Sequence, residues 1–214
     1  MAIILPFMGI RPHKEYVRMI ASPPYDVVSS KEARILAQNN PMSYLHISRP
    51  EIDLPFGVDE HDSQVYIKGK VNYQMFKEKG WLRKDDKKYF YFYKQRMGNH
   101  TQIGIVCVAS CDDYDNDIIK KHELTRQDKE DDRTKHIDTI GANTEPVFFT
   151  YKANNNIDEL ISNYINLMPF EYEVQSDDGV IHTVWVCSDN ALIDQLIRLF
   201  ADIQYLYVAD GHHR

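Results

Sequence analysis

The chain has few cysteines and no excess of basic residues. Its 214 residues include only three cysteines, Cys107, Cys111 and Cys187. A small, odd number without metal-like spacing does not fit a disulfide framework, so we expect small buried apolar residues in a reducing compartment. The net charge of -7 argues against a broad nucleic-acid surface, which would need a basic balance.

Long apolar runs are absent as well. No stretch approaches the roughly 20 apolar residues that a membrane helix needs. The first residues lack a basic region and are interrupted by Pro6, which does not fit a signal peptide. We therefore predict a cytoplasmic protein without membrane contact. With 43% hydrophobic and 27% charged residues, the composition is that of a globular chain with a core of its own.

What the sequence does contain is a series of strand and helix signals, which predict an α/β (α+β) fold. We expect a mixed sheet with β-hairpins and flanking helices. Ser29 and Glu32 form a capping-box pattern at a helix start. Two adjacent prolines predict a rigid, non-helical loop over 22–26, and residues 112–117 form an acidic loop. The predicted strands are 3–11, 43–48, 88–96, 101–110, 146–151, 170–175, 180–187 and 203–208, and the predicted helices are 29–39, 62–79, 124–141, 156–168 and 190–200.

The length suits one α/β domain or two closely packed lobes, about 1–120 and 121–214. The last predicted strand, 203–208, is a continuous apolar run, and a glycine turn follows it. A buried strand that leads into such a turn should continue into a helix. We therefore expect the chain to be the N-terminal part of a longer protein.

The last five residues, Asp210-Gly211-His212-His213-Arg214, have the chemistry of a phosphate site. Gly211 lets the backbone turn sharply, and the first N–H groups of a following helix favour an anion. Arg214 adds forked donors that match phosphate, and the two histidines add further donors. Asp210 would cap the helix, orient a histidine or bind magnesium. The alternative is a capped helix start with two surface histidines; zinc at both is disfavoured because adjacent helical side chains diverge by about 100°.

Two further segments carry candidate residues. Glu123 would be a general base for a substrate hydroxyl, with His122 binding phosphate or orienting it. Alternatively the two are an exposed pair at a helix start that Thr125 caps with Asp128. Arg133 either binds the ligand or belongs to a solvated helix face.

The rigid loop carries Tyr25 and Asp26, which are candidates for substrate binding and catalysis or for a structural brace. Asn143 and Glu145 precede a strand, where they would hydrogen-bond a small polar substrate or form a turn. The tyrosine-rich residues 89–93 indicate core or the face of a homodimer rather than a nucleobase platform.

The terminal motif resembles the signature of the ParB/sulfiredoxin-like superfamily, in particular its free serine kinases. More widely, the chain resembles the bacterial and archaeal family catalogued as domain of unknown function 1015. The residues that carry this second resemblance are Pro6-Phe7, Arg11-Pro12, Pro23-Pro24-Tyr25-Asp26-Val27, Asn40-Pro41, Arg49-Pro50-Glu51, His122-Glu123-Leu124-Thr125, Ala142-Asn143, Pro146-Val147 and the terminal motif. Members of that family are typically about twice this length, in line with the expected longer protein.

The resemblance to the serine kinases implies phosphate contacts from Gly211, His212, His213 and Arg214. It also implies a helper role for Asp210 through magnesium, and a ParB/sulfiredoxin-like element near the C-terminal end. Sulfiredoxins have a cysteine where this chain has His212, so their sulfur chemistry is not implied.

We therefore expect a kinase that uses Mg²⁺ with ATP or ADP and phosphorylates a serine-like hydroxyl. Glu123 or Asp26 would take the hydroxyl proton, and few other side chains are needed because phosphoryl transfer depends mainly on positioning. The partners would be a nucleotide and a small polar substrate, with nucleic acid disfavoured. The alternatives are a non-catalytic nucleotide-binding switch of the ParB type and a structural or interaction protein.

Overall fold

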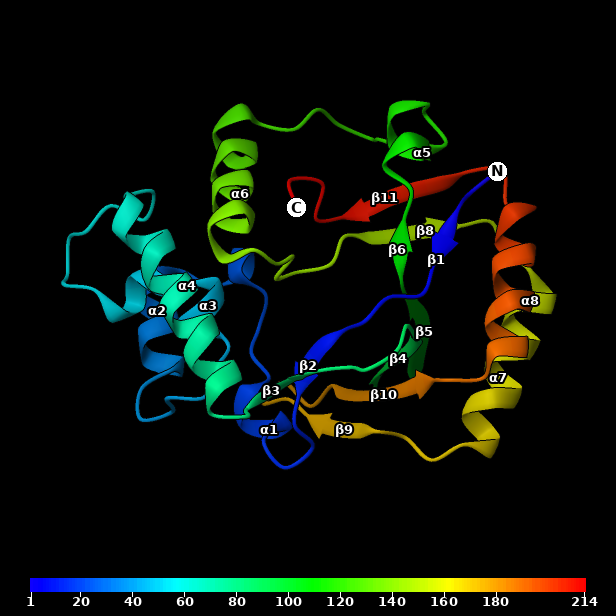
Figure 1. Cartoon of the computed structure of the whole chain (residues 1–214), viewed down its shortest axis with the longest axis horizontal. Helices are drawn as coiled ribbons and strands as arrows, with labels where there is room; N and C mark the ends of the chain where they lie inside the picture. Colours follow the sequence, from blue (N-terminus) through cyan, green and yellow to red (C-terminus); the bar gives the residue numbers. More distant parts are fainter. The chain divides into compact units, whose positions relative to one another are not determined.

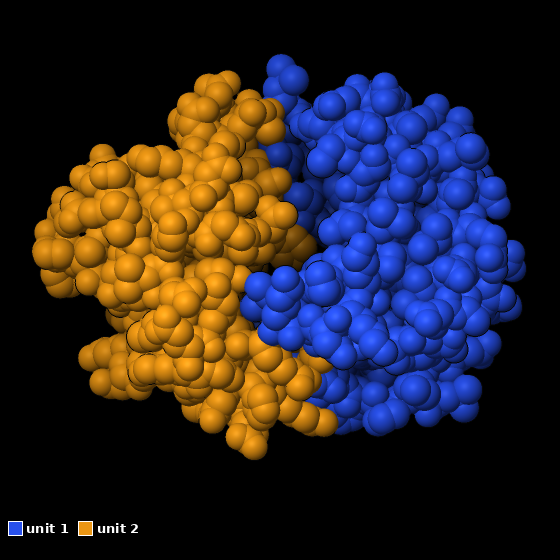
Figure 2. Space-filling view, viewed as in Figure 1, with its two compact units in different colours: residues 1–10, 84–124, 147–212 blue, residues 11–83, 125–146, 213–214 orange.

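The computed structural model describes residues 1–214 and confirms a mixed α/β fold. Its contacts group the chain into two compact units, coloured separately in Figure 2. Unit 1 comprises residues 1–10, 84–124 and 147–212, and unit 2 comprises residues 11–83, 125–146 and 213–214. Both units thus combine residues from before and after position 120. None of the helices has the length and apolar character that crossing a membrane requires.

Unit 1 contains a four-stranded antiparallel sheet in the order β5-β4-β10-β9 (Figure 1). Its strands are β4 (Phe90–Met97), β5 (His100–Val106), β9 (Tyr172–Gln175) and β10 (Ile181–Cys187). Both predicted hairpins are confirmed, and Gly98 turns the first with a φ of 58°. Phe92 lies opposite Trp185 in the register, and both side chains are buried. Along β10 every second side chain from Thr183 to Cys187 is buried, and this alternation fixes which face of the sheet packs on the core.

A second, mixed sheet has the order β7-β11-β8. Here β11 (Leu206–Asp210) runs parallel to β7 (Ile119–Lys120) and antiparallel to β8 (Phe148–Tyr151). The strand predicted at 203–208 thus begins later, because Ile203 still closes the preceding helix through its bond to the Phe200 carbonyl (2.9 Å). The strand also ends later than predicted, at Asp210.

Two amphipathic helices, α7 (Asn155–Leu167) and α8 (Asn190–Ala201), pack side by side in this unit (Figure 1). Asn154 and Asp189 cap them by accepting backbone N–H bonds, and their apolar faces join the core with both sheets. The remaining elements of this unit are β1 (Ile4–Leu5), which pairs with β6 (Val108–Ala109), and α5 (Cys111–Asp115).

Unit 2 is largely helical. Its elements are α1 (Val17–Ile20), the 3₁₀ turn η1 (Tyr25–Val27), α2 (Ser30–Leu36), α3 (Leu45–Ser48), the 3₁₀ turn η2 (Pro50–Asp53), α4 (Ser63–Glu78) and α6 (Gln127–Ile140). The capping box of Ser29 and Glu32 is present as predicted. Gly69 lets α4 approach its neighbours, since an added Cβ would lie 2.8 Å from Pro50 Cγ and 3.2 Å from Ile140 Cδ1. Two short strands that pair with each other, β2 (Ile10–Pro12) and β3 (Leu82–Lys84), lie where the chain passes between the units.

Several local predictions are wrong. The strand predicted at 43–48 is absent, and its last four residues form α3. The segment is largely buried, and a short buried run shows no readable period. The acidic segment 112–117 lies largely in helix α5, and the loop 22–26 enters a 3₁₀ turn at Tyr25. The predicted strand 3–11 is split into β1 and the start of β2 around Pro6.

The cysteine and cap predictions also need correction. Only Cys187 is buried, whereas Cys107 is half-buried and Cys111 is exposed. The cap expected from Thr125 is absent, because α6 starts one residue later and the Thr125 hydroxyl donates to Glu130 instead (2.8 Å).

Candidate functional site

The residues predicted for a site fall into both units. Five of them, His122, Glu123, Asp210, Gly211 and His212, belong to unit 1. The other seven belong to unit 2 and are Tyr25, Asp26, Arg133, Asn143, Glu145, His213 and Arg214. Each group is described within its own unit.

In unit 1, the parallel pairing of β7 with β11 brings two distant segments together. Parallel strands place their carboxyl ends at the same edge of a sheet. His122 and His212 each stand two residues beyond the end of their strand, β7 and β11 respectively. Gly211 is buried with a φ of 75°, a left-handed conformation that glycine adopts readily, and this turns the chain after the strand.

The side chains of His122, Glu123 and His212 meet at this edge, and we call them the His–Glu–His cluster. Glu123 Oε1 lies 3.1 Å from His122 Nε2 and 3.0 Å from His212 Nε2. The two imidazole rings stand edge to face with centroids 5.6 Å apart. His122 Nδ1 lies 3.0 Å from the Val208 carbonyl oxygen, which fixes the ring. The structure thus brings together three residues that the sequence assigned to phosphate binding and proton transfer.

The cluster is partly open to solvent, and its three side chains contact one another. The side chains of His122 and Glu123 are each 51% exposed, and that of His212 is 24% exposed. A half-exposed carboxylate oriented by two imidazoles has the geometry of a general base that a substrate can reach. The same arrangement means that the histidines already face an anion, so a phosphate would have to share them with Glu123.

Magnesium fits this edge of the sheet poorly. Mg²⁺ prefers six oxygen ligands at about 2.0–2.1 Å and rarely binds imidazole. The only group of side chains in the structure with converging metal ligands offers two histidine nitrogens and one carboxylate. Asp210, the residue predicted to bind magnesium, has an exposed side chain and is not a member of that group.

In unit 2, Arg214 is held by two carboxylates. Its side chain is 9% exposed, with Nη2 lying 2.5 Å from Asp26 Oδ2 and Nε lying 3.5 Å from Glu145 Oε2. Nη1 donates to the Pro146 carbonyl oxygen (3.1 Å). The sequence assigned the guanidinium charge of Arg214 to a phosphate. In the structure this charge is compensated by the carboxylates of Asp26, in η1, and Glu145, before β8.

Tyr25 contacts both Glu145 and Arg214. Its backbone N–H donates to Glu145 Oε1 (3.2 Å). Its ring lies near two guanidinium groups, with Arg133 Cζ at 4.0 Å and Arg214 Cζ at 5.9 Å from the centroid. Burial raises the pKa of the Glu145 carboxyl, although Arg214 acts in the opposite direction. Burial likewise raises the pKa of the Tyr25 hydroxyl against the effect of Arg133. The Glu145 carboxyl and the Tyr25 hydroxyl therefore keep their protons to a higher pH than exposed groups of the same kind.

Arg133 does not belong to a solvated helix face, because its side chain is only 12% exposed. It binds Asp132 through Nε (2.8 Å) and Nη2 (2.5 Å). Asp132 also accepts hydrogen bonds from the Tyr66 hydroxyl (2.6 Å) and interacts with His61 Nδ1 (3.0 Å). Burial alone would raise the pKa of Asp132, but the bonds from Tyr66 and Arg133 outweigh it and lower the pKa.

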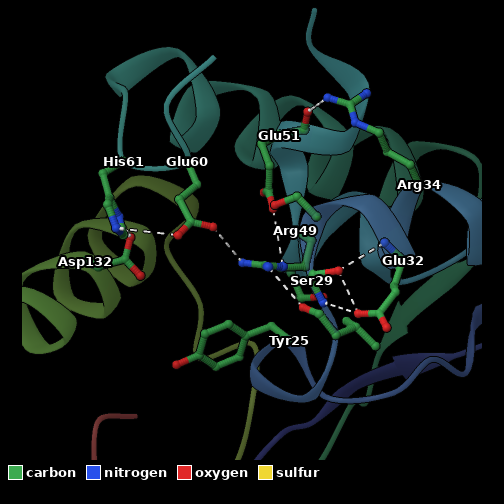
Figure 3. Close-up of polar contacts among 12 residues, drawn as sticks. Tyr25, Ser29, Glu32, Arg34, Arg49, Glu51, Glu60, His61 and Asp132 are labelled. Atoms are coloured by element: carbon green, nitrogen blue, oxygen red, sulfur yellow. Dashed lines mark hydrogen bonds and ion pairs between the residues drawn. The ribbon is translucent and has the colours of Figure 1, made fainter. Parts of the chain in front are cut away.

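A shallow, open pocket lies beside Arg133 and Tyr25. Figure 3 shows Tyr25 and several of the polar side chains that line this pocket. Arg49 enters it with Nη1 3.1 Å from Glu60 Oε2 and Nε 3.3 Å from Glu51 Oε1. Figure 3 shows the continuous chain of ion pairs from Glu51 through Arg49 and Glu60 to His61. Acidic and basic groups alternate along this wall, which suits a small ligand that carries both charges.

The other predicted residues are placed less tightly. His213 Nε2 accepts the Arg126 backbone N–H (3.1 Å), and Asn143 is exposed in the loop before β8. No helix follows Gly211 within the chain, where residues 212–213 form a turn.

Comparison with known proteins now adds a family. The model of the family described as "Protein of unknown function (DUF1015)" matches residues 4–214. The chain belongs to this family. The resemblance that the short motifs indicated therefore extends over nearly the whole sequence. No curated protein and no solved structure matches the chain.

Because the description of the DUF1015 family assigns no activity, the roles of its residues rest on their geometry. Sequence reasoning did not assign a role to Arg49, Glu51, Glu60, His61 or Asp132, all of which line the pocket. Arg49 and Glu51 belong to one of the short motifs that indicated the family, and that motif was the available signal. His61 and Glu60 precede a helix in a polar segment and look like ordinary surface residues in the sequence.

Proposed function

We propose that this member of the DUF1015 family is a nucleotide-dependent small-molecule kinase. It would transfer the terminal phosphoryl group of ATP or ADP to the hydroxyl of a free amino acid such as serine. The observation that supports this most is the His–Glu–His cluster, in which residues chosen for phosphoryl transfer from two distant segments converge on one carboxylate. The ParB/sulfiredoxin-like relation of the terminal motif is part of the same proposal.

The chemistry needs one proton acceptor and a cradle for phosphates. The acceptor hydroxyl oxygen attacks the terminal phosphorus, its proton passes to Glu123, and the bond from that phosphorus to the bridging oxygen of the nucleotide breaks. His122 and His212 orient Glu123 through their Nε2 atoms, and the terminal motif is proposed to bind the phosphates. Because little covalent chemistry is required of the protein, positioning by a few side chains suffices. Mg²⁺ would arrive on the nucleotide phosphates, since the chain's clustered donors lack the oxygen shell it prefers.

We also propose that the pocket of unit 2 binds a free amino acid. A free amino acid carries a carboxylate and an ammonium group, and the Arg49–Glu60 pair in the pocket provides a partner for each charge by exchange. Tyr25 adds an aromatic face beside these groups, and Asn143 and Glu145 stay as further candidates for contacts with the acceptor.

A nucleotide-binding switch is the second candidate, and the contacts of Arg214 favour it. Its guanidinium is bound to Asp26 and Glu145, so a phosphate that binds Arg214 would displace at least one carboxylate. Exchange of one anion for another gives two discrete arrangements, which is what a ligand-controlled switch requires. Asp26, if released in this way, would also become available as the alternative proton acceptor.

Turnover distinguishes these candidates. The natural full-length protein is incubated with Mg²⁺, serine and either ATP or ADP, and phosphoserine is measured by mass spectrometry. We expect phosphoserine from the native protein and a loss of about 10²–10⁴-fold in kcat for Glu123→Gln, the usual contribution of a general base. Glu159→Gln changes an exposed glutamate of α7 and serves as the matched control. Nucleotide binding without acceptor-dependent turnover would support the switch, and absence of both would contradict the proposal.

A further inference from the structure

The His–Glu–His cluster also has the arrangement of a metal site. One ligand atom from each of His122, Glu123 and His212 lies within 4.8 Å of the other two. The shortest of these separations, from Glu123 Oε1 to the two Nε2 atoms, are 3.0 and 3.1 Å. Ligands bonded to one tetrahedral ion at about 2.0–2.1 Å lie about 3.3 Å from one another, so the cluster is already close to that spacing.

The second ring nitrogen of His122 gives an independent indication. Nδ1 faces the Val208 carbonyl oxygen at 3.0 Å, and a carbonyl oxygen only accepts hydrogen bonds, so Nδ1 carries the proton. In the neutral ring, Nε2 then presents a lone pair, and it points at a carboxylate oxygen that also has only lone pairs to offer. Two acceptors at this distance are held together by a cation between them, which is either a second proton on the ring or a metal ion. Metal-binding histidines are typically anchored through their other nitrogen in this way.

From these contacts we propose that His122, Glu123 and His212 bind a divalent first-row transition-metal ion such as Zn²⁺. Imidazole nitrogens and a carboxylate favour this class of ion over Mg²⁺ and Ca²⁺, which prefer oxygen ligands. The two segments that carry the ligands directly follow β7 and β11, which pair in the same sheet, so the site is anchored on paired backbone from two parts of the chain.

Three protein ligands leave at least one coordination position open. The half-exposed side chains of His122 and Glu123 allow water or a substrate oxygen to reach it. Sites with three protein ligands and an open position are typical of catalytic zinc, whereas structural zinc is enclosed by four. A phosphate oxygen is one ligand that such a position accepts.

The inference does not depend on the kinase proposal, because metal binding follows from the donors alone. It does change the role of one residue. A metal ion bound to Oε1 of Glu123 leaves Oε2 as an acceptor but lowers the basicity of the carboxylate, so metal binding weakens the general-base role. Excess Zn²⁺ should therefore inhibit any turnover for which Glu123 is the base.

Metal binding is measured without nucleotide, so its outcome is separate from that of the kinase assay. The full-length protein is stripped of metal and titrated with Zn²⁺ against a chromophoric chelator, with Mg²⁺ as comparison, and with Co²⁺ while its visible absorption is recorded. The variants are His122→Ala and Glu123→Gln. The matched control is His100→Ala, which removes an exposed histidine at the start of β5.

We expect a Zn²⁺ site whose affinity falls by at least about 10–100-fold in each variant, the loss that even outer-shell partners cause, with no change in the control. Co²⁺ should give the visible bands of a low-symmetry site. X-ray absorption of the Zn²⁺-bound native protein should show two imidazoles and a carboxylate, and this result does not depend on whether the variants fold. Zn²⁺ binding that is equal in native protein and folded variants, or X-ray absorption with other ligands, would mean adventitious binding and overturn the proposal. No Zn²⁺ binding would mean that only protons hold the cluster, and would overturn it too.

Discussion

Replacing Asp132 with alanine should be among the most damaging single changes in unit 2. The carboxylate is 8% exposed and compensates Arg133, which is 12% exposed. Breaking a buried ion pair from one side typically costs about 3–5 kcal/mol, because the remaining charge stays buried. The bonds from Tyr66 and His61 are lost as well, so the upper part of this range applies.

Urea unfolding followed by circular dichroism measures this effect. With m-values of about 2–3 kcal/mol/M for a chain of this size, a loss of about 4–5 kcal/mol should lower the midpoint of the transition that includes α6 by about 1.3–2.5 M. Asp131→Ala removes the exposed neighbouring carboxylate and should shift the midpoint by less than about 0.3 M. Tyr66→Phe isolates one hydrogen bond to a charged group and should cost about 1.5–3 kcal/mol.

The pH dependence provides a second check on the same residue. Hydrogen bonds and Arg133 hold the pKa of Asp132 below its ordinary value of 3.8 in the folded chain. The stability that the carboxylate contributes is therefore fully present above this pH and is lost as the pH falls below it. The difference between native protein and Asp132→Asn should shrink below pH 4. Equal stability of native protein and Asp132→Ala at pH 7 would refute the reasoning.

Two further predictions concern buried positions of unit 2. Gly69→Ala adds a Cβ within 2.8 Å of Pro50 and should destabilise the protein by about 1–3 kcal/mol despite the better helix propensity of alanine; a raised melting temperature would contradict this. Burial and the Arg133 charge lower the pKa of His136 to about 4, so the stability from its neutral ring is lost as the pH falls from 6.5 through 4. His136→Gln should therefore reduce the slope of the free energy of unfolding against pH between 6.5 and 4. An unchanged slope would contradict this role of His136.

Elements with strong periodicity or turn signals could be predicted from the sequence. The hairpins around Gly98 and Gly179 and the helices α7 and α8 agree with the patterns that predicted them. In each case the local preference and the buried face indicate the same structure. The short elements α3 and α5 were missed because four or five residues are too few to show a period, so their conformation is decided by packing.

The candidate site could be predicted only residue by residue. His122, Glu123 and His212 were each selected for their chemistry, but their convergence depends on the parallel pairing of β7 with β11, which no local pattern encodes. Arg214 is assigned to phosphate from the sequence because its forked donors match that group. Its carboxylate partners, Asp26 before α2 and Glu145 before β8, are too distant in the sequence for the pairing to be predicted. Ion pairs between such segments become visible only in the folded chain.

Binding of nucleotide phosphates through the terminal motif is the central claim, and calorimetry tests it most directly. The full-length protein is titrated with ADP and ATP in the presence of Mg²⁺, beside Arg214→Ala and the exposed-arginine control Arg198→Ala. We predict that the native protein and the control bind nucleotide, and that Arg214→Ala binds it at least about 10-fold more weakly, as expected for one lost charge-assisted contact. Absence of nucleotide binding, or equal affinity in Arg214→Ala, would contradict a phosphate site at Asp210-Gly211-His212-His213-Arg214.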